Sequence, residues 1–86
     1  MRLTKDGVQE LLLRVELLLV SKNIPKEKFY AESGISSASF SQWKSGKYAP
    51  SVNAIYKMAN YLGVSAEYLM GIDDAIPQEV QKEKLT

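Results

Sequence analysis

KEKFYAESGISSASFSQWKSGK, residues 26–47, is the stretch that decides the fold of this 86-residue chain. A short amphipathic segment ends at Ser33-Gly34-Ile35-Ser36, and a second one begins at once. Gly34 can adopt the left-handed backbone conformation that a tight turn between two helices needs. Ser36 can cap the second helix with its hydroxyl group. The stretch therefore predicts two short helices joined by a tight turn.

The spacing of these two segments is that of a helix-turn-helix over residues 25–46. We predict one helix over Pro25–Ser33 and another over Ser37–Ser45, with Gly46 as the C-terminal stop. A motif of this kind places its second helix in the major groove of DNA. The stretch thus predicts a DNA-binding surface as well as a local fold.

The charge of the chain is unevenly distributed, although its net value is only +1. Residues 1–21 are balanced, residues 22–57 carry six lysines and two glutamates for a net +4, and residues 58–86 carry −3. The basic part coincides with the two short helices. Such asymmetry is expected where one face meets phosphates, although ordinary surface charge would also produce it.

The composition excludes several classes of site. Without cysteine the chain can form neither disulfides nor thiolate metal sites, and a reducing cytoplasm is compatible. Histidine, the commonest general base and metal ligand, is also missing. No glycine-rich phosphate loop and no paired carboxylates framed by a core are present. We therefore expect no enzyme activity, no cofactor and no metal site.

No signal peptide is visible in the sequence. The apolar run Leu11–Val20 is interrupted by Arg14 and Glu16 and is too short to span a bilayer. We therefore expect a cytoplasmic protein without membrane contact.

A first helix is predicted before the motif, opened by a capping box at Asp6-Gly7-Val8-Gln9 and ended by Asn23-Ile24-Pro25. Its apolar residues form two stripes at helical spacing, one more than a lone amphipathic helix needs. The second stripe is either buried by the fold or offered to a partner subunit. The first stripe is Val8, Leu11, Leu12, Val15, Leu18 and Leu19, and the second is Leu13, Leu17 and Val20.

Two more helices are predicted after the motif, capped by Ser51 and Ser65 and ended by Gly63 and Gly71. The expected fold is therefore all-α, a compact five-helix domain over residues 1–71. Residues 72–86 read as a polar C-terminal tail or dimerisation segment, in which a short extra helix could start at Pro77.

Residues from about Val15 to Gly71 resemble the DNA-binding domain of the lambdoid phage repressors and of XRE-type bacterial regulators. The matching positions are Phe29, Gly34, Ile35-Ser36, Phe40, Trp43, Gly46-Lys47 and Pro50-Ser51, followed by Ile55, Met58-Ala59, Leu62 to Ser65, and Tyr68-Leu69. The chain departs from the family at three positions. Lys26 stands where Gln is usual, Tyr30 where Ala is usual, and Pro25 where a capping Ser or Thr is common.

The resemblance implies which residues contact DNA. The base-edge readers would be Ser37, Ala38, Ser39 and Gln42. The phosphate contacts would be Lys26, Ser36, Lys44, Ser45, Lys47 and Tyr48. Gln42 is the best reader, because an amide can bond adenine N6 and N7 together, although a solvated surface glutamine is the alternative. Each lysine alone could equally be a solvated charge, and for Lys57 that is the better interpretation.

Trp43 is expected to pack in the core rather than stack on a base, because it lies three residues after Phe40 on the same helix face. The second helix of the motif contains neither Arg nor Asn, the other strong base readers. Selectivity would then depend on Gln42, on DNA shape and on the following loop.

The favoured interpretation is a dimeric repressor that binds double-stranded DNA at a near-palindromic operator. One alternative is the antitoxin of a toxin–antitoxin pair, which would share the DNA-binding domain and hold a toxin. Another is a protein-interaction module that has lost DNA affinity, which the near-neutral total charge favours and the +4 segment disfavours.

Overall fold

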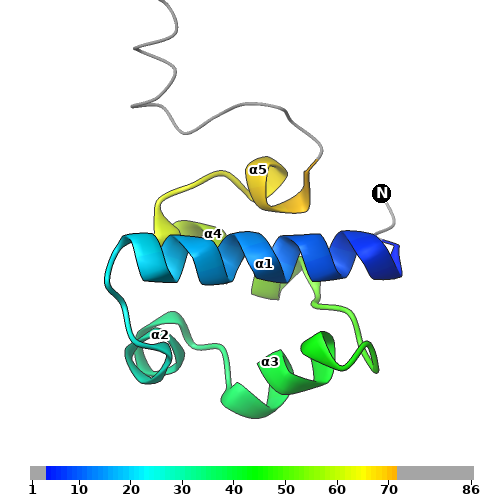
Figure 1. Ribbon diagram of the computed structural model, residues 1–86, viewed down its shortest axis with the longest axis horizontal. Helices are drawn as coiled ribbons and strands as arrows, with labels where there is room; N and C mark the ends of the chain where they lie inside the picture. Colours follow the sequence, from blue (N-terminus) through cyan, green and yellow to red (C-terminus); the bar gives the residue numbers. More distant parts are fainter. Residues whose placement is uncertain (1–3, 72–86) are drawn as a thin grey trace, which may run out of the picture.

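The computed structural model describes residues 4–71, which form five α-helices and no strand (Figure 1). The helices are α1 Lys5–Ser21, α2 Lys26–Ser33, α3 Ser37–Lys44, α4 Val52–Leu62 and α5 Ala66–Met70. The predicted all-α, five-helix architecture is confirmed, and the two helices of the motif end within one residue of their expected bounds. The predicted tail 72–86 and the helix expected at Pro77 lie outside the described residues.

The long helix α1 lies at the centre of the arrangement. It packs against α3, α4 and α5, while α2 packs against α4. Figure 1 shows α1 between α5 on one side and the pair α2–α3 on the other, with α4 behind it. The helix-turn-helix pair therefore occupies one side of the molecule.

The core is formed by the first apolar stripe of α1 together with apolar residues from every other helix. Leu11, Val15 and Leu19 of α1 are buried, and Leu18 is half-buried against them. The largest fully buried side chains are Phe29, Phe40, Leu11, Leu12, Met58, Leu62, Leu69 and Val15. The prediction that this stripe faces the core is confirmed.

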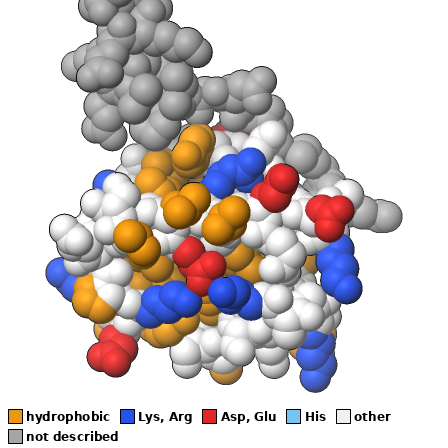
Figure 2. Space-filling model, viewed as in Figure 1, with side chains coloured by type: hydrophobic (Ala, Val, Ile, Leu, Met, Phe, Trp, Pro, Cys, Tyr) orange, Lys and Arg blue, Asp and Glu red, His pale blue; other side chains and the backbone are white. Residues whose placement is uncertain are grey.

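The second stripe of α1 faces solvent in the single chain. Leu13, Leu17 and Val20 are 54%, 60% and 74% exposed. Figure 2 shows hydrophobic side chains gathered on the face over α1. Of the two outcomes expected for this stripe, burial by the described part of the fold is therefore wrong.

The start of α1 differs from the predicted capping box. Thr4 is the N-cap, and its Oγ1 accepts a hydrogen bond of 3.0 Å from the backbone N–H of Gly7. Asp6 instead lies in the first turn, where a negative charge is favourable beside the helix N-terminus. Gln9 donates through Nε2 to the Trp43 carbonyl at 3.0 Å and so joins α1 to α3. A hydroxyl two residues upstream thus displaced Asp6 as the cap.

The end of α1 follows from Asn23, whose φ of 57° is left-handed. Asparagine tolerates this conformation better than most residues other than glycine. The next N–H, that of Ile24, donates to the Leu19 carbonyl at 2.8 Å, which closes the helix before Pro25.

Aromatic rings fill the space between α2, α3 and α4. Phe29 lies 5.9 Å from Phe40 and 5.7 Å from Tyr61, measured between ring centroids. Tyr30, which replaces the family's usual small residue, is half-buried at the edge of this cluster, 6.0 Å from Phe40. The larger ring is thus accommodated by contact with other aromatic rings.

Candidate nucleic-acid interface

The turn between α2 and α3 has the predicted geometry. Gly34 has a φ of 82°, a left-handed conformation that side-chain-bearing residues rarely adopt. Ile35 is buried after it, and its N–H donates to Ser33 Oγ at 3.2 Å. Ser36 then caps α3, with its Oγ accepting from the Ser39 N–H at 3.1 Å. The predicted roles of Gly34 and Ser36 in the turn are confirmed.

The orientation of α3 is fixed by two buried aromatic residues. Phe40 and Trp43 are 2% and 7% exposed, and their rings pack edge to face at 6.2 Å. The prediction that Trp43 is a core residue is confirmed. Since these two side chains point inward, the opposite face of α3 points away from the domain.

The outer face of α3 presents three of the four predicted base readers. Ser37, Ala38 and Gln42 are exposed together. Ser39 is half-buried, and its Oγ accepts a 2.9 Å hydrogen bond from Ser36 Oγ, so it belongs more to the helix cap than to the outer face. Ser41 is also exposed on α3 but was not among the predicted readers. Its position four residues after Ser37 places it on the same face of the helix, and this spacing could have identified it as an exposed outer-face residue.

Three of the predicted phosphate contacts lie where α3 ends. Ser45 Oγ donates to the Gln42 carbonyl at 2.9 Å, and the Lys47 backbone N–H donates to the same oxygen at 3.1 Å. The side chains of Lys47 and Tyr48 are exposed, with the ammonium group 5.8 Å from the ring centroid. The Lys47 charge forms no ion pair with any other described residue. This end of α3 therefore offers a lysine charge and a phenol to an approaching anion.

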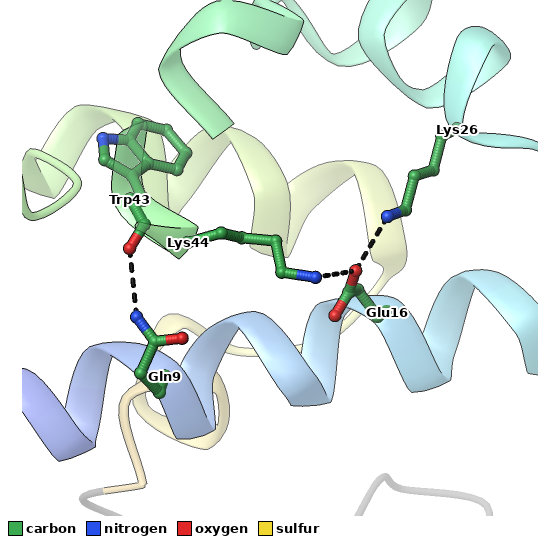
Figure 3. A network of polar contacts seen from close by, with 5 residues as sticks. All are labelled: Gln9, Glu16, Lys26, Trp43 and Lys44. Atoms are coloured by element: carbon green, nitrogen blue, oxygen red, sulfur yellow. Dashed lines mark hydrogen bonds and ion pairs between the residues drawn. The ribbon is translucent and has the colours of Figure 1, made fainter. Parts of the chain in front are cut away.

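Lys26 and Lys44, also predicted phosphate contacts, are joined to one carboxylate of α1 (Figure 3). Their ammonium nitrogens lie 2.8 and 2.9 Å from the same atom, Glu16 Oε2. Partial burial raises the pKa of Glu16, but the hydrogen bonds and charges of the two lysines outweigh it, so its pKa lies below the ordinary value. The hydrogen bond to Glu16 raises the pKa of Lys26. Sequence reasoning missed Glu16, which lies ten residues before one lysine and 28 before the other.

The first turn of α2 has free backbone donors. Pro25 is its N-cap and provides no side-chain hydrogen bond, as expected from the missing Ser or Thr. The unpaired N–H groups of a first helical turn attract anions. Lys26 adds a positive charge at the same end of the helix.

A cleft beside the turn brings together two helix starts and a lysine. Its lining includes Ser36, the cap of α3, and Ser51, the cap of α4, whose Oγ accepts from the Ala54 N–H at 3.1 Å. Lys57 also lines it and reaches to 4.0 Å from the position that a Cβ on Gly34 would occupy. The sequence interpretation of Lys57 as a solvated charge did not foresee this position beside the turn.

The remaining chemistry of the described residues is limited. Residues 4–71 contain no cluster of three or more acidic, histidine or cysteine side chains able to hold a metal ion. Nor does this part of the chain contain a helix with the length and apolar character needed to cross a membrane.

The comparisons with known proteins agree with this geometry. A family model described as helix-turn-helix matches residues 15–69, more than half of the chain. Searches of curated proteins and of solved structures found no match. The matched range begins within α1 and ends in α5, so it includes the turn and both helices beside it. The chain therefore belongs to the XRE-type helix-turn-helix family of DNA-binding transcription regulators.

Proposed function

We propose that the chain is a transcriptional repressor that binds a near-palindromic operator as a homodimer. The observation that carries the proposal is the outer face of α3, where Ser37, Ala38 and Gln42 are exposed opposite the buried Phe40 and Trp43. A helix held by one face and free on the other can enter the major groove. We place this activity in the cytoplasm.

In this proposal Gln42 reads a base pair and Ala38 contacts a thymine methyl group. Ser37 donates to or accepts from a neighbouring base edge, and Ser39 can do the same once its hydroxyl turns away from Ser36 Oγ. Phosphates are held by six side chains and by the open first turn of α2. These six are Lys26, Ser36, Lys44, Ser45, Lys47 and Tyr48.

The test is a fluorescence titration with a duplex that has been selected for affinity. If about three to five cationic contacts form in each half-site, the affinity of one half-site should fall roughly tenfold to a thousandfold between about 50 and 200 mM salt, and that of the dimer for both half-sites roughly 10³- to 10⁵-fold. A scrambled duplex of equal length should bind more weakly and retain a salt dependence. An affinity that does not change with salt would contradict the proposal.

The homodimer is supported by the exposed stripe of Leu13, Leu17 and Val20 on α1. Soluble monomers seldom leave a contiguous apolar patch uncovered. By contrast, Leu69 of α5 is buried and Tyr68 is half-buried in the same chain, so α5 has less apolar surface to offer. We therefore favour α1 over α5 as the dimer interface.

The position of α1 is compatible with a dimer that binds one duplex. Figure 1 shows α1 between α5 and the pair α2–α3. Consider a two-fold axis that runs alongside α1, from the α5 side of the molecule to the α3 side. Such an axis would pack the two α1 helices against each other in antiparallel orientation. Both α3 helices would then lie on the same side of the dimer, as a near-palindromic site requires.

The test of the interface is a solution mass measurement at micromolar concentration, with and without operator. Leu17→Glu should yield a monomer, because it puts a charge in the centre of the stripe. Val52→Glu is the matched control, since Val52 of α4 is 66% exposed but lies outside the stripe. A wild-type chain that is monomeric both alone and on its operator would contradict the homodimer.

The exposed stripe also favours a second candidate function, an antitoxin that holds a toxin on α1. An antitoxin and a repressor would bind DNA alike, so the distinction rests on the partner. A monomer that dimerises only on DNA, together with binding of a neighbouring gene's product to the stripe, would favour the antitoxin. A chain with a bound partner but no duplex affinity at any salt concentration would instead favour the interaction module.

A further inference from the structure

One carboxylate oxygen of α1 holds two lysines of the helix-turn-helix pair. Glu16 Oε2 lies 2.8 Å from Lys26 Nζ at the start of α2 and 2.9 Å from Lys44 Nζ at the end of α3. Figure 3 shows both side chains reaching across to α1, where they meet at this atom. In the described residues these are the two shortest ion pairs.

The three side chains differ in how far they are exposed. The Glu16 side chain is 23% exposed, whereas those of Lys26 and Lys44 are 51% and 46% exposed. Glu16 is therefore the least exposed of the three, and the two lysines extend further into solvent. An ammonium group has three donors, and the long stem of a lysine lets it turn towards another anion.

We propose that Glu16 is an internal counterion that competes with DNA phosphates for Lys26 and Lys44. Without DNA the carboxylate takes the place of a phosphate and accepts one hydrogen bond from each ammonium group. On DNA the two lysines leave Glu16 and contact phosphates of the DNA backbone, and the Glu16 carboxylate is left close to these phosphates. This inference rests on the proposed function, in which both lysines contact phosphates.

The consequence is a lower affinity for DNA that does not depend on the base sequence of the duplex. Phosphate contacts supply affinity to every duplex alike, whereas base contacts separate one duplex from another. A carboxylate that competes for two lysines lowers affinity for all duplexes by the same factor. The affinity that remains then depends more strongly on Gln42 and its neighbours on the outer face of α3, which contains no Arg or Asn.

The first experiment replaces the carboxylate by its isosteric amide in Glu16→Gln. The amide oxygen can still accept a hydrogen bond from a lysine, so a thermal melt is expected to show a folded domain. The variant should bind a scrambled duplex roughly threefold to tenfold more tightly at about 100 mM salt. The slope of log affinity against log salt should become steeper by about one unit for each bound subunit, because each subunit gains one uncompensated cation that displaces counterions.

The matched control is Glu10→Gln, which removes the same charge from the same helix. Glu10 faces Arg14 at 3.9 Å, its side chain is 68% exposed, and it contacts neither lysine. Any gain in duplex affinity that both variants share reflects the change in net charge alone. A Glu16→Gln variant that follows Glu10→Gln, or that binds more weakly than wild type, would overturn the inference.

A second experiment tests whether the lysines are the groups released. Lys44→Gln should lower duplex affinity by a smaller factor in wild type than in Glu16→Gln, because in wild type the phosphate contact of Lys44 is offset by the ion pair with Glu16 that it gives up. Equal factors in the two backgrounds would overturn the inference. If Glu16→Gln does not fold, the loss of duplex affinity in Lys44→Gln is compared with the loss in Lys47→Gln, both in the wild-type background. An equal loss of affinity in the two variants would overturn the inference.

The failures of the two proposals are distinguishable. A wild-type chain that binds no duplex at any salt concentration overturns the proposed function and this inference together. A wild-type chain that binds with salt dependence, while Glu16→Gln behaves as Glu10→Gln does, overturns this inference alone.

Discussion

On its inner side α3 buries Phe40 and Trp43, whereas on its outer side it exposes Ser37, Ala38 and Gln42. The two inner rings pack against each other, and Phe40 also packs against the aromatic residues of α2. The exposed side chains of the outer face have no such packing. One eight-residue helix therefore carries core side chains on one face and the side chains proposed to contact DNA on the other. Substitutions on the two faces should then change different measured quantities.

The largest expected effect is on the inner face. Trp43→Ala should reduce the free energy of unfolding by about 3–5 kcal/mol, because the removed indole leaves a cavity. That is a large share of the roughly 5–15 kcal/mol that stabilises a typical domain. A denaturant melt measures the loss, with Tyr56→Ala, which removes a ring that is 50% exposed, as the control. A near-normal melt together with lost DNA binding would mean that Trp43 contributes to DNA binding and not to the stability of the core.

The next effect is on the outer face. Gln42→Ala should cost about 1–3 kcal/mol of binding free energy on the preferred duplex and relax the preference at one base pair. Its unfolding free energy should stay close to that of wild type, since the side chain is exposed. Titrations with preferred and scrambled duplexes measure this, with Asn60→Ala on α4 as the exposed amide control. Equal weakening on both duplexes would mean that Gln42 does not read a base.

A smaller effect is expected from Lys47, just beyond the end of α3. Lys47→Gln should weaken preferred and scrambled duplexes by about the same factor and lower the salt slope by about 0.9 for each half-site. The reason is that its exposed ammonium group can contact a phosphate but carries no sequence information. A changed base preference in this variant would give Lys47 a reading role.

The smallest expected effect is a pH dependence of stability from Glu16. Its pKa in the folded chain lies below the ordinary 4.5, so it stabilises the fold at neutral pH and loses this contribution as the pH falls through the folded value. Since both lysines are about half exposed, the contribution should be at most about 1 kcal/mol. Denaturant melts of wild type and Glu16→Gln should therefore differ at neutral pH and converge at low pH. A difference that does not change with pH would contradict this assignment.

Much of the fold could be predicted from the sequence, because it follows from local signals. Gly34 with Ser36 marks the turn and the cap of α3, and helical spacing separates the buried Leu11 from the exposed Leu17. The one incorrect cap arose from competition between neighbouring polar residues. Asp6 and Thr4 can both cap a helix, and sequence alone does not decide between them.

The candidate site was less predictable, because its contacts join residues that are distant in sequence. The outer face of α3 follows from the inward positions of Phe40 and Trp43. The ion pairs of Glu16 link three helices, and no local pattern indicates them. The position of Lys57 beside Gly34 likewise depends on how α4 packs against α2.

The most direct test of the account is an amide NMR titration of the isotope-labelled chain with a selected duplex. The account predicts that the largest shift changes occur in the first turns of α2 and α3 and along the outer face from Ser37 to Gln42. The amides of α5, on the opposite side of α1 in Figure 1, should change little. Changes confined to α1 and α5, with α3 unaffected by the duplex, would contradict the claim that the outer face of α3 binds DNA.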